Sequence, residues 1–233
     1  MKNYLSILFL LLFSLSSTTA QTDRTLKNGF GVKLNISSPG SNYGLASPTL
    51  TDINGQSIGS IDFGSGFMIG VQVGNVWYFN PKEKFGIGLM VNWMDFTIAF
   101  ASGNNLVTNG FETNTNKLTF DFTIAEIGPI ATFKLNDNSA FDVYYNLRPS
   151  IYFSTILTND SFNSFNQDIL SIAFGPTHAI GAAFRYKVFY VGPELVIGRL
   201  KDRKVRNADF FDEYLYDDDI KATHFRIVVG AKF

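Results

Sequence analysis

The chain has 233 residues, with 19 basic and 20 acidic side chains and a formal net charge of −1, a balance that excludes the basic footprint of a nucleic-acid-binding protein. It has no cysteine, which excludes a disulfide scaffold and a thiolate metal site. Hydrophobic residues make up 45% of the chain, including 24 Phe and 10 Tyr. Beyond the first residues no apolar run is long enough for a transmembrane helix, so we expect an all-β chain.

Residues 1–20 are organised like a secretory signal peptide. Lys2 supplies the positive charge, residues 5–15 are apolar but too few to span a bilayer as a helix, and residues 16–20 are small. We predict cleavage after Ala20, and the alternative is an uncleaved anchor. Residues 21–233 then form a single exported domain.

Eight segments alternate apolar and polar residues with a period of two, which predicts β-strands. They are residues 27–37, 63–79, 84–100, 117–135, 140–156, 169–186, 187–200 and 221–233. The alternation changes phase near Met94 and Asp95, and again near Ala125 and Glu126. Each phase change predicts a β-bulge.

The connections between these strands alternate between long and short. We expect long loops at residues 38–62, 101–116, 157–168 and 201–220, and short turns at residues 80–83, 136–139 and 186–187. This rhythm is typical of a transmembrane barrel with short periplasmic turns and long extracellular loops. A soluble sandwich has no reason to place all its short turns at one end.

Aromatic residues gather around the three short turns and predict a girdle at one membrane interface. The residues expected in it are Trp77, Tyr78, Phe79, Phe85, Phe133, Phe141, Tyr144, Tyr145, Phe184, Tyr186, Phe189, Tyr190 and Phe233. One strand face is almost uninterrupted Val, Ile, Leu and Phe, which suits lipid. The other carries Gly, Asn, Gln and charged residues, which suit a small polar interior. A lipocalin-like soluble barrel, the alternative, has the opposite arrangement.

The last strand places Phe225, Ile227 and Val229 on one face and ends the chain on Phe233. Such an ending resembles the signal read by the barrel-insertion machinery of Gram-negative bacteria. Residues 123–129, TIAEIGP, resemble a Leu-Glu-Ile-Pro strand motif, with a Gly inserted before the Pro. The chain is therefore similar to the small, eight-stranded outer-membrane β-barrel or porin-like families of Bacteroidetes-type bacteria. That resemblance implies a closed, antiparallel, up-and-down transmembrane barrel.

Four charged residues are expected to point into the interior at similar depth: Glu126, Arg148, Glu194 and Arg226. Arg185, Asp142 and Lys33 are expected nearer the periplasmic end. Buried charges must be paired, and arginine suits carboxylate through its planar fork. The network is either a selective narrow path or a plug of ion pairs that fixes strand register.

The two histidines, His178 and His224, lie on separate predicted strands without a nucleophile and orienting partner in their motifs. We expect no catalytic residues, no metal site and no cofactor. The loop at residues 201–220 has a basic half and an acidic, aromatic half. It is either a surface that binds lipopolysaccharide phosphates, cations or a partner, or a solvated loop tip.

These observations predict a non-enzymatic outer-membrane protein with a structural, envelope or surface-interaction role. Its expected partners are outer-membrane lipids, lipopolysaccharide and the insertion machinery, with no nucleic acid, and we expect a monomer. The alternatives are a narrow passive channel or carrier for small solutes, a lipid-modifying barrel enzyme and a secreted lipocalin-like binder.

Overall fold

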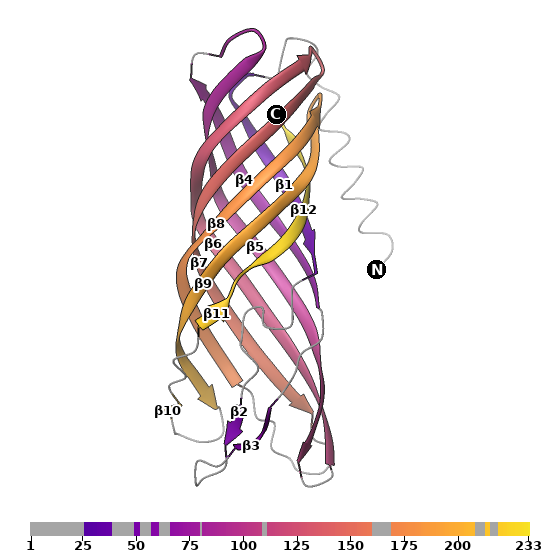
Figure 1. Cartoon of the computed structure of the whole chain (residues 1–233), viewed down its shortest axis with the longest axis vertical. Coiled ribbons are helices and arrows are strands. Elements are labelled where there is room, and N and C mark those ends of the chain that lie inside the picture. Colours follow the sequence, from indigo (N-terminus) through magenta and orange to yellow (C-terminus); the bar gives the residue numbers. More distant parts are fainter. Residues whose placement is uncertain are drawn as a thin grey trace.

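The computed structural model describes residues 26–38, 49–51, 57–60, 66–79, 81–108, 111–159, 169–207, 213–214 and 219–233. This part of the chain is all β-structure, with no helix (Figure 1). The proposed signal peptide, residues 1–20, lies outside the described residues.

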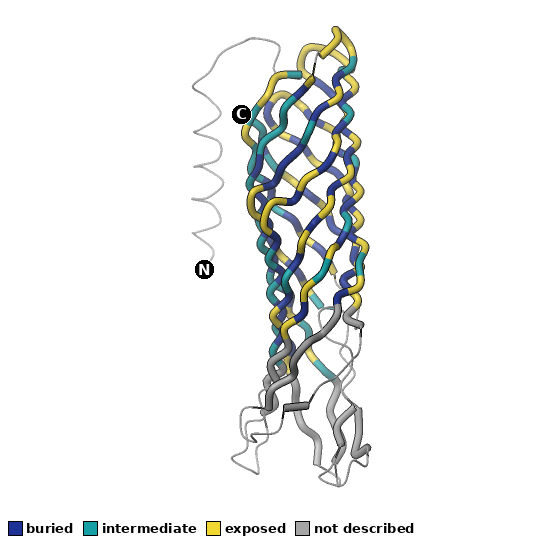
Figure 2. Tube along the Cα trace, turned by 90° about the vertical axis from the view of Figure 1, so that its left-hand side faces the viewer, coloured by how far each residue is buried: buried dark blue, intermediate teal, exposed yellow. Residues whose placement is uncertain are grey.

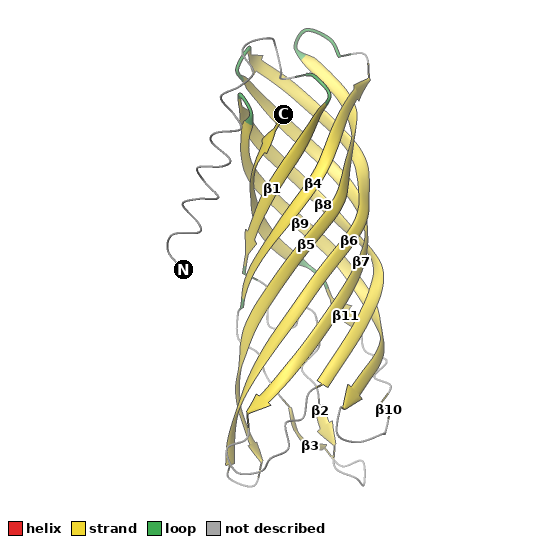
Figure 3. Ribbon diagram, turned by 180° about the vertical axis from the view of Figure 1, so that it is seen from behind, coloured by secondary structure: helices red, strands yellow, loops and turns green. Residues whose placement is uncertain are grey.

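Eight long strands form an antiparallel, up-and-down ring, and the strands are inclined to the long axis of the ring (Figures 1 and 3). They are β1 (Gly29–Ser37), β4 (Phe67–Phe79), β5 (Phe85–Thr108), β6 (Phe111–Asn136), β7 (Ser139–Asn159), β8 (Ile169–Tyr186), β9 (Phe189–Asn207) and β12 (His224–Lys232). Strands that follow one another in this series pair with each other, and β12 also pairs with β1. Every strand therefore has a partner on both sides.

The predicted short turns all lie at one end of the ring, where the chain also ends (Figure 1). Residues 137–138 and 187–188 form two-residue turns, and residues 80–84 connect β4 to β5. The third turn had been expected at residues 186–187. It lies one residue later because Tyr186 still pairs with Phe189 across the turn. We call this end the short-turn end.

At the opposite end the strands extend further than the sequence indicates. β5 and β6 continue through most of residues 101–116, which were expected to form a loop, and only residues 109–110 separate them. The expected loop at residues 201–220 likewise begins as strand, because β9 runs to Asn207 and pairs with β8. Backbone ladder bonds need no apolar side chain, so a ladder continues where the hydrophobic alternation has ended.

Four short strands lie in the long connections. β2 (Thr49–Thr51) and β3 (Ser57–Ser60) form a small separate hairpin between β1 and β4. β10 (Glu213–Tyr214) and β11 (Asp219–Lys221) both pair with β9. The side chains of residues 201–220, which include the basic and acidic halves of the fourth connection, lie outside the described part of the chain.

Exposure alternates from residue to residue along the strands (Figure 2). On β7, Phe141, Val143 and Leu147 are exposed, whereas their neighbours Asp142 and Arg148 are buried. The same alternation on the other long strands gives the ring an apolar outer face and an interior of polar, small and charged side chains. The face assignments made from the two-residue period are therefore correct for most of the wall.

Two bulges face each other where the sequence changes phase. Against β4, Val73 pairs with Met94 and Gly74 with Asn92, so Trp93 is an extra residue of β5. Against β7, the register of β6 shifts between Thr123 and Ile127, the segment that contains Ala125. Ala125 has a positive φ of 57°. Consecutive residues on each bulged strand consequently point outward together.

The bulges determine which charges enter the ring. Trp93 and Met94 are both exposed, which returns Asp95 to the interior. Ile124 and Ala125 are both exposed, which does the same for Glu126. Without the extra residues, strict alternation would place both carboxylates on the apolar outer face.

Candidate functional site

A network of charged side chains crosses the interior of the ring at the level of the bulges. Its centre is Asp95 on β5, whose side chain is fully buried. The Asp95 Oδ2 atom accepts hydrogen bonds from Arg148 Nη2 on β7 at 2.7 Å, from Arg226 Nη2 on β12 at 2.9 Å and from Gln72 Nε2 on β4 at 2.9 Å. One carboxylate therefore joins three other strands of the wall.

Each arginine of the network also contacts carboxylates on its other side. Arg148 lies 3.4 Å from Asp121 and 3.5 Å from Glu126. Arg226 donates from Nε to Glu194 Oε1 at 2.5 Å and forms a second contact to the same oxygen through Nη2. These contacts pair the buried guanidinium groups, which desolvation would otherwise penalise heavily.

Neutral side chains also donate hydrogen bonds to the carboxylates of Glu126 and Glu194, which lie at the two sides of the network. Asn146 Nδ2 donates to Glu126 at 3.0 Å, and the Tyr144 hydroxyl donates to Glu194 at 2.8 Å. Tyr144, Gly181 and Glu194 are register partners on the adjacent strands β7, β8 and β9. The Tyr144 ring reaches Glu194 across Gly181, where a Cβ atom would lie only 2.2 Å from the ring Cζ.

The structure brings together the four residues named from the sequence. Glu126, Arg148, Glu194 and Arg226 are all buried inside the ring, and each belongs to this network. Sequence reasoning missed Asp95 as the centre. The signal was present in the phase change beside it, because a bulge at Trp93 turns Asp95 inward.

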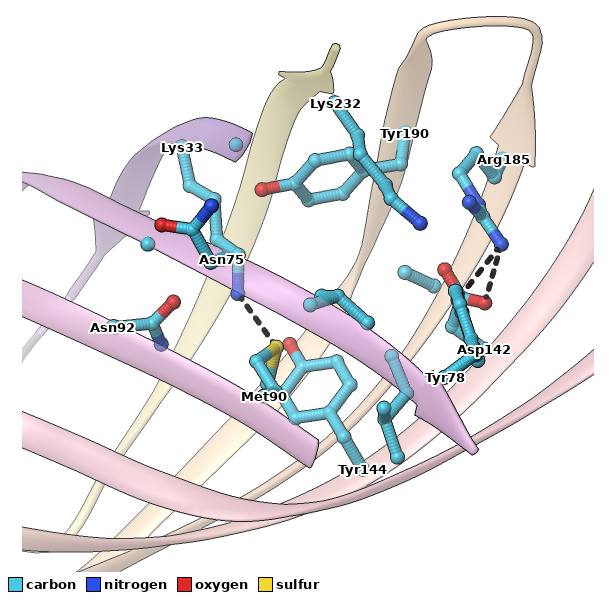
Figure 4. A pocket seen from close by; sticks show the side chains of 15 residues that line it. Lys33, Asn75, Tyr78, Met90, Asn92, Asp142, Tyr144, Arg185, Tyr190 and Lys232 are labelled. Atoms are coloured by element: carbon cyan, nitrogen blue, oxygen red, sulfur yellow. Dashed lines mark hydrogen bonds and ion pairs between the residues drawn. The ribbon is translucent and has the colours of Figure 1, made fainter. Parts of the chain in front are cut away.

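A second group of side chains lies between this network and the short-turn end. Arg185 donates to Asp142 at 3.0 Å, and Thr132 donates to the same Asp142 oxygen at 2.6 Å. Lys33 and Lys232 enter from β1 and β12 and line a cavity of about 40 Å³ together with Arg185 and Asp142 (Figure 4). The three charges expected at this end, Arg185, Asp142 and Lys33, are all buried.

Three tyrosines expected in the outer aromatic girdle belong to this interior group. Tyr78, Tyr144 and Tyr190 are buried, whereas their neighbours Phe79, Tyr145 and Phe189 are exposed. The expectation was wrong for these three because alternation directs every second residue of a run inward. Consecutive aromatic residues in a strand therefore alternate between the outer face and the interior of the ring.

The two histidines occupy opposite faces of the wall. His178 is half-buried on the outer face, where its Nδ1 atom lies 2.7 Å from the Tyr145 hydroxyl. His224 is buried inside, and its Nδ1 atom donates to the Ala222 carbonyl at 2.9 Å. They cannot contribute to one common site.

Within the described residues, no three His, Cys, Asp or Glu side chains are arranged to hold a metal ion. The same part of the chain forms no helix that is long and apolar enough to cross a membrane. No protein-family model matches the sequence, and no curated protein matches it.

Proposed function

We propose that the chain is a closed, eight-stranded β-barrel of a Gram-negative outer membrane, with a non-enzymatic structural, envelope or surface-interaction role. The observation that carries the proposal is that the outer face of the ring is apolar and its interior is polar, the opposite of the arrangement in a soluble barrel. Among the described residues, 31 large apolar side chains are exposed, and they occur on all eight long strands. Soluble monomers rarely expose a contiguous apolar patch larger than a few hundred Å², so a face of this extent favours contact with lipid.

The height of the apolar band suits a bilayer. On β7, every outward residue from Phe141 to Phe153 is apolar or aromatic. With about 3.3 Å per residue and a strand tilt near 40°, this stretch covers a height of roughly 30 Å. The hydrocarbon core of a bilayer has about the same thickness. The short-turn end then faces the periplasm, and the extended ends of β5 and β6 project to the outside.

The interior favours a structural role over a passive channel, which is the competing function. Asp95, Arg148 and Arg226 join opposite walls and are fully buried. Eight strands leave little space beyond what side chains fill. An ion would have to break contacts of this network in order to pass, so we propose a barrel that is occluded at this level.

The remaining alternatives are less well supported. A lipid-modifying enzyme needs a nucleophile, a base and an orienting group within hydrogen-bond reach. The two candidate bases lie apart, His178 on the outer face and His224 inside the ring. A lipocalin-like binder has an apolar interior, whereas this ring buries Arg148, Arg185 and Arg226.

A heat-shift gel on washed outer membranes tests the proposal. Boiled and unboiled samples of the bacterial host's membranes and soluble fraction are compared after expression of the full chain. We expect a membrane-associated band whose mobility changes on boiling, because a closed barrel resists detergent until it is heated. A protein that is recovered in the soluble fraction and shows no change would overturn the proposal in favour of the lipocalin-like alternative.

A further inference from the structure

The cavity at the short-turn end is lined by more cations than anions (Figure 4). Among its lining residues, Lys33, Arg185 and Lys232 are basic and Asp142 is the acidic one. Asp142 already accepts from Arg185 at 3.0 Å and from Thr132 at 2.6 Å. Its charge is therefore matched by Arg185, and the two lysines remain without a carboxylate in the cavity wall.

Among the residues that the structure describes, neither lysine has a strong hydrogen-bond acceptor. Lys33 Nζ lies 3.3 Å from the Met90 sulfur, which accepts weakly, and 5.2 Å from the centre of the Tyr144 ring. Lys232 Nζ is buried without a hydrogen-bond partner and lies 4.5 Å from the centre of the Tyr78 ring. Aromatic faces attract a cation but replace only part of the hydration that an ammonium group loses on burial.

The unsatisfied atoms of the cavity wall all belong to groups that can donate. Within the described part of the chain, four buried atoms of lining residues have no hydrogen-bond partner: Asn92 Nδ2, Arg185 Nε, Tyr190 Oη and Lys232 Nζ. Three of these are nitrogen donors that cannot accept, and the Tyr190 hydroxyl is able to donate. Buried polar groups in native proteins are normally satisfied, so four of them around one cavity indicate a missing acceptor.

We propose that this cavity binds one small monovalent anion, such as chloride or a short carboxylate, between Lys232, Lys33 and Tyr190. An anion supplies the acceptor that these donors lack and places a negative charge in direct contact with the lysines, whereas Glu194 and Glu126 act on Lys33 only from outside the cavity wall. The cavity volume of about 40 Å³ exceeds the roughly 10–15 Å³ that a single water needs, which limits the ligand to a few heavy atoms. A water molecule would satisfy some of the donors but would place no negative charge beside the two lysines.

The site lies inside the ring, so its test does not depend on where the protein resides in the cell. The mature chain, folded in a neutral detergent, is unfolded with urea at constant ionic strength while chloride or acetate replaces gluconate, an anion too large for the cavity. A ligand that binds the folded state alone stabilises it by an amount that rises with the logarithm of its concentration. We expect the unfolding midpoint to rise in this way.

Lys232→Met is the diagnostic variant, because it removes the cation and keeps the length of the side chain. Loss of one charge-assisted hydrogen bond should weaken anion binding about tenfold or more. The variant should also be at least as stable as the native chain in gluconate alone, since an uncompensated buried cation is gone. Lys82→Met, at an exposed residue within the β4–β5 connection, is the matched control and should keep the native response.

Two results would overturn the proposal. One is a native midpoint that does not change when chloride or acetate replaces gluconate. The other is an equal response in Lys232→Met and Lys82→Met, which would indicate salt screening. If Lys232→Met does not fold, Lys33→Met is measured in the same way, and an unchanged response there would equally contradict the anion site.

Discussion

Asp95 and Arg226 are separated by 131 positions in the sequence, and their side chains meet at 2.9 Å inside the ring. Asp95 lies on β5 and Arg226 on β12, with β1 and β4 between them in the wall. The contact therefore crosses the interior and ties the end of the chain to its first half. It forms only when the ring is assembled, so it should contribute to the stability of the complete fold.

Asp95→Asn tests the importance of this centre. The substitution keeps the shape but removes the charge that faces both Arg148 and Arg226. Breaking a buried ion pair costs about 3–5 kcal/mol of unfolding free energy, and we expect a loss of that order in a urea titration of the detergent-folded chain. Asp137→Asn is the control: its side chain is 88% exposed and pairs with Lys134 at the surface, so the expected loss is below about 1 kcal/mol. Equal losses in the two variants would contradict the central role of Asp95.

Ala125→Gly tests the bulge on β6. The positive φ of Ala125 is unfavourable for a residue with a Cβ atom and accessible to glycine. We expect the variant to gain about 1 kcal/mol of unfolding free energy. Ala131→Gly, at a regular position of the same strand, should instead lose about 0.5–1 kcal/mol. A loss in both variants would show that the bulge is not the conformation that Ala125 adopts in solution.

Gly181→Ala tests the passage of Tyr144 across β8. The added Cβ would lie 2.2 Å from the ring Cζ and 2.4 Å from the hydroxyl oxygen, so the ring must move away from Glu194. We expect a loss of about 1–3 kcal/mol from overpacking and the broken hydrogen bond. Gly31→Ala is the control, because its nearest contact would be an ordinary 3.5 Å. A Gly181→Ala variant as stable as the native chain would contradict the packing of Tyr144 on Gly181.

Conductance tests the occlusion of the interior. We expect the folded chain to give no steady ion current in planar lipid bilayers, because Asp95, Arg148 and Arg226 bridge the walls at one level. Arg148→Met, which removes one cation of the bridge, provides the comparison. Discrete current steps in the native protein that change in size in Arg148→Met would support the channel and contradict the occluded barrel.

The sequence predicts the parts of this fold that depend on alternation. A two-residue period and turn-forming residues predict the number of long strands, the inward direction of Arg148 and Arg226 and the end that carries the short turns. The extension of β5 and β6 through residues 101–116 was missed, because backbone pairing there continues without apolar alternation. Asp95 was missed as the centre because its partners come from strands that only the assembled ring brings together.

The interior tyrosines show a second limit of sequence reasoning. Tyr78, Tyr144 and Tyr190 stand in aromatic runs that suggest a membrane girdle, and alternation alone would have placed them inside. Composition and periodicity gave opposite answers at these residues, and periodicity was correct. The cavity that they help to line depends on side-chain volumes across the ring, for which the sequence carries no local signal.

The most direct test of the lipid-facing assignment uses the intrinsic fluorescence of the two tryptophans. Trp77 and Trp93 are the only tryptophans of the chain, and their rings meet edge to face at 6.0 Å on the outer side of β4 and β5. Residues 21–233 would be refolded into vesicles of brominated phosphatidylcholine and into matched vesicles without bromine. We predict strong quenching in the brominated vesicles, because both indoles face the acyl chains. Emission that is equal in the two preparations would contradict a lipid-facing outer surface and the membrane barrel with it.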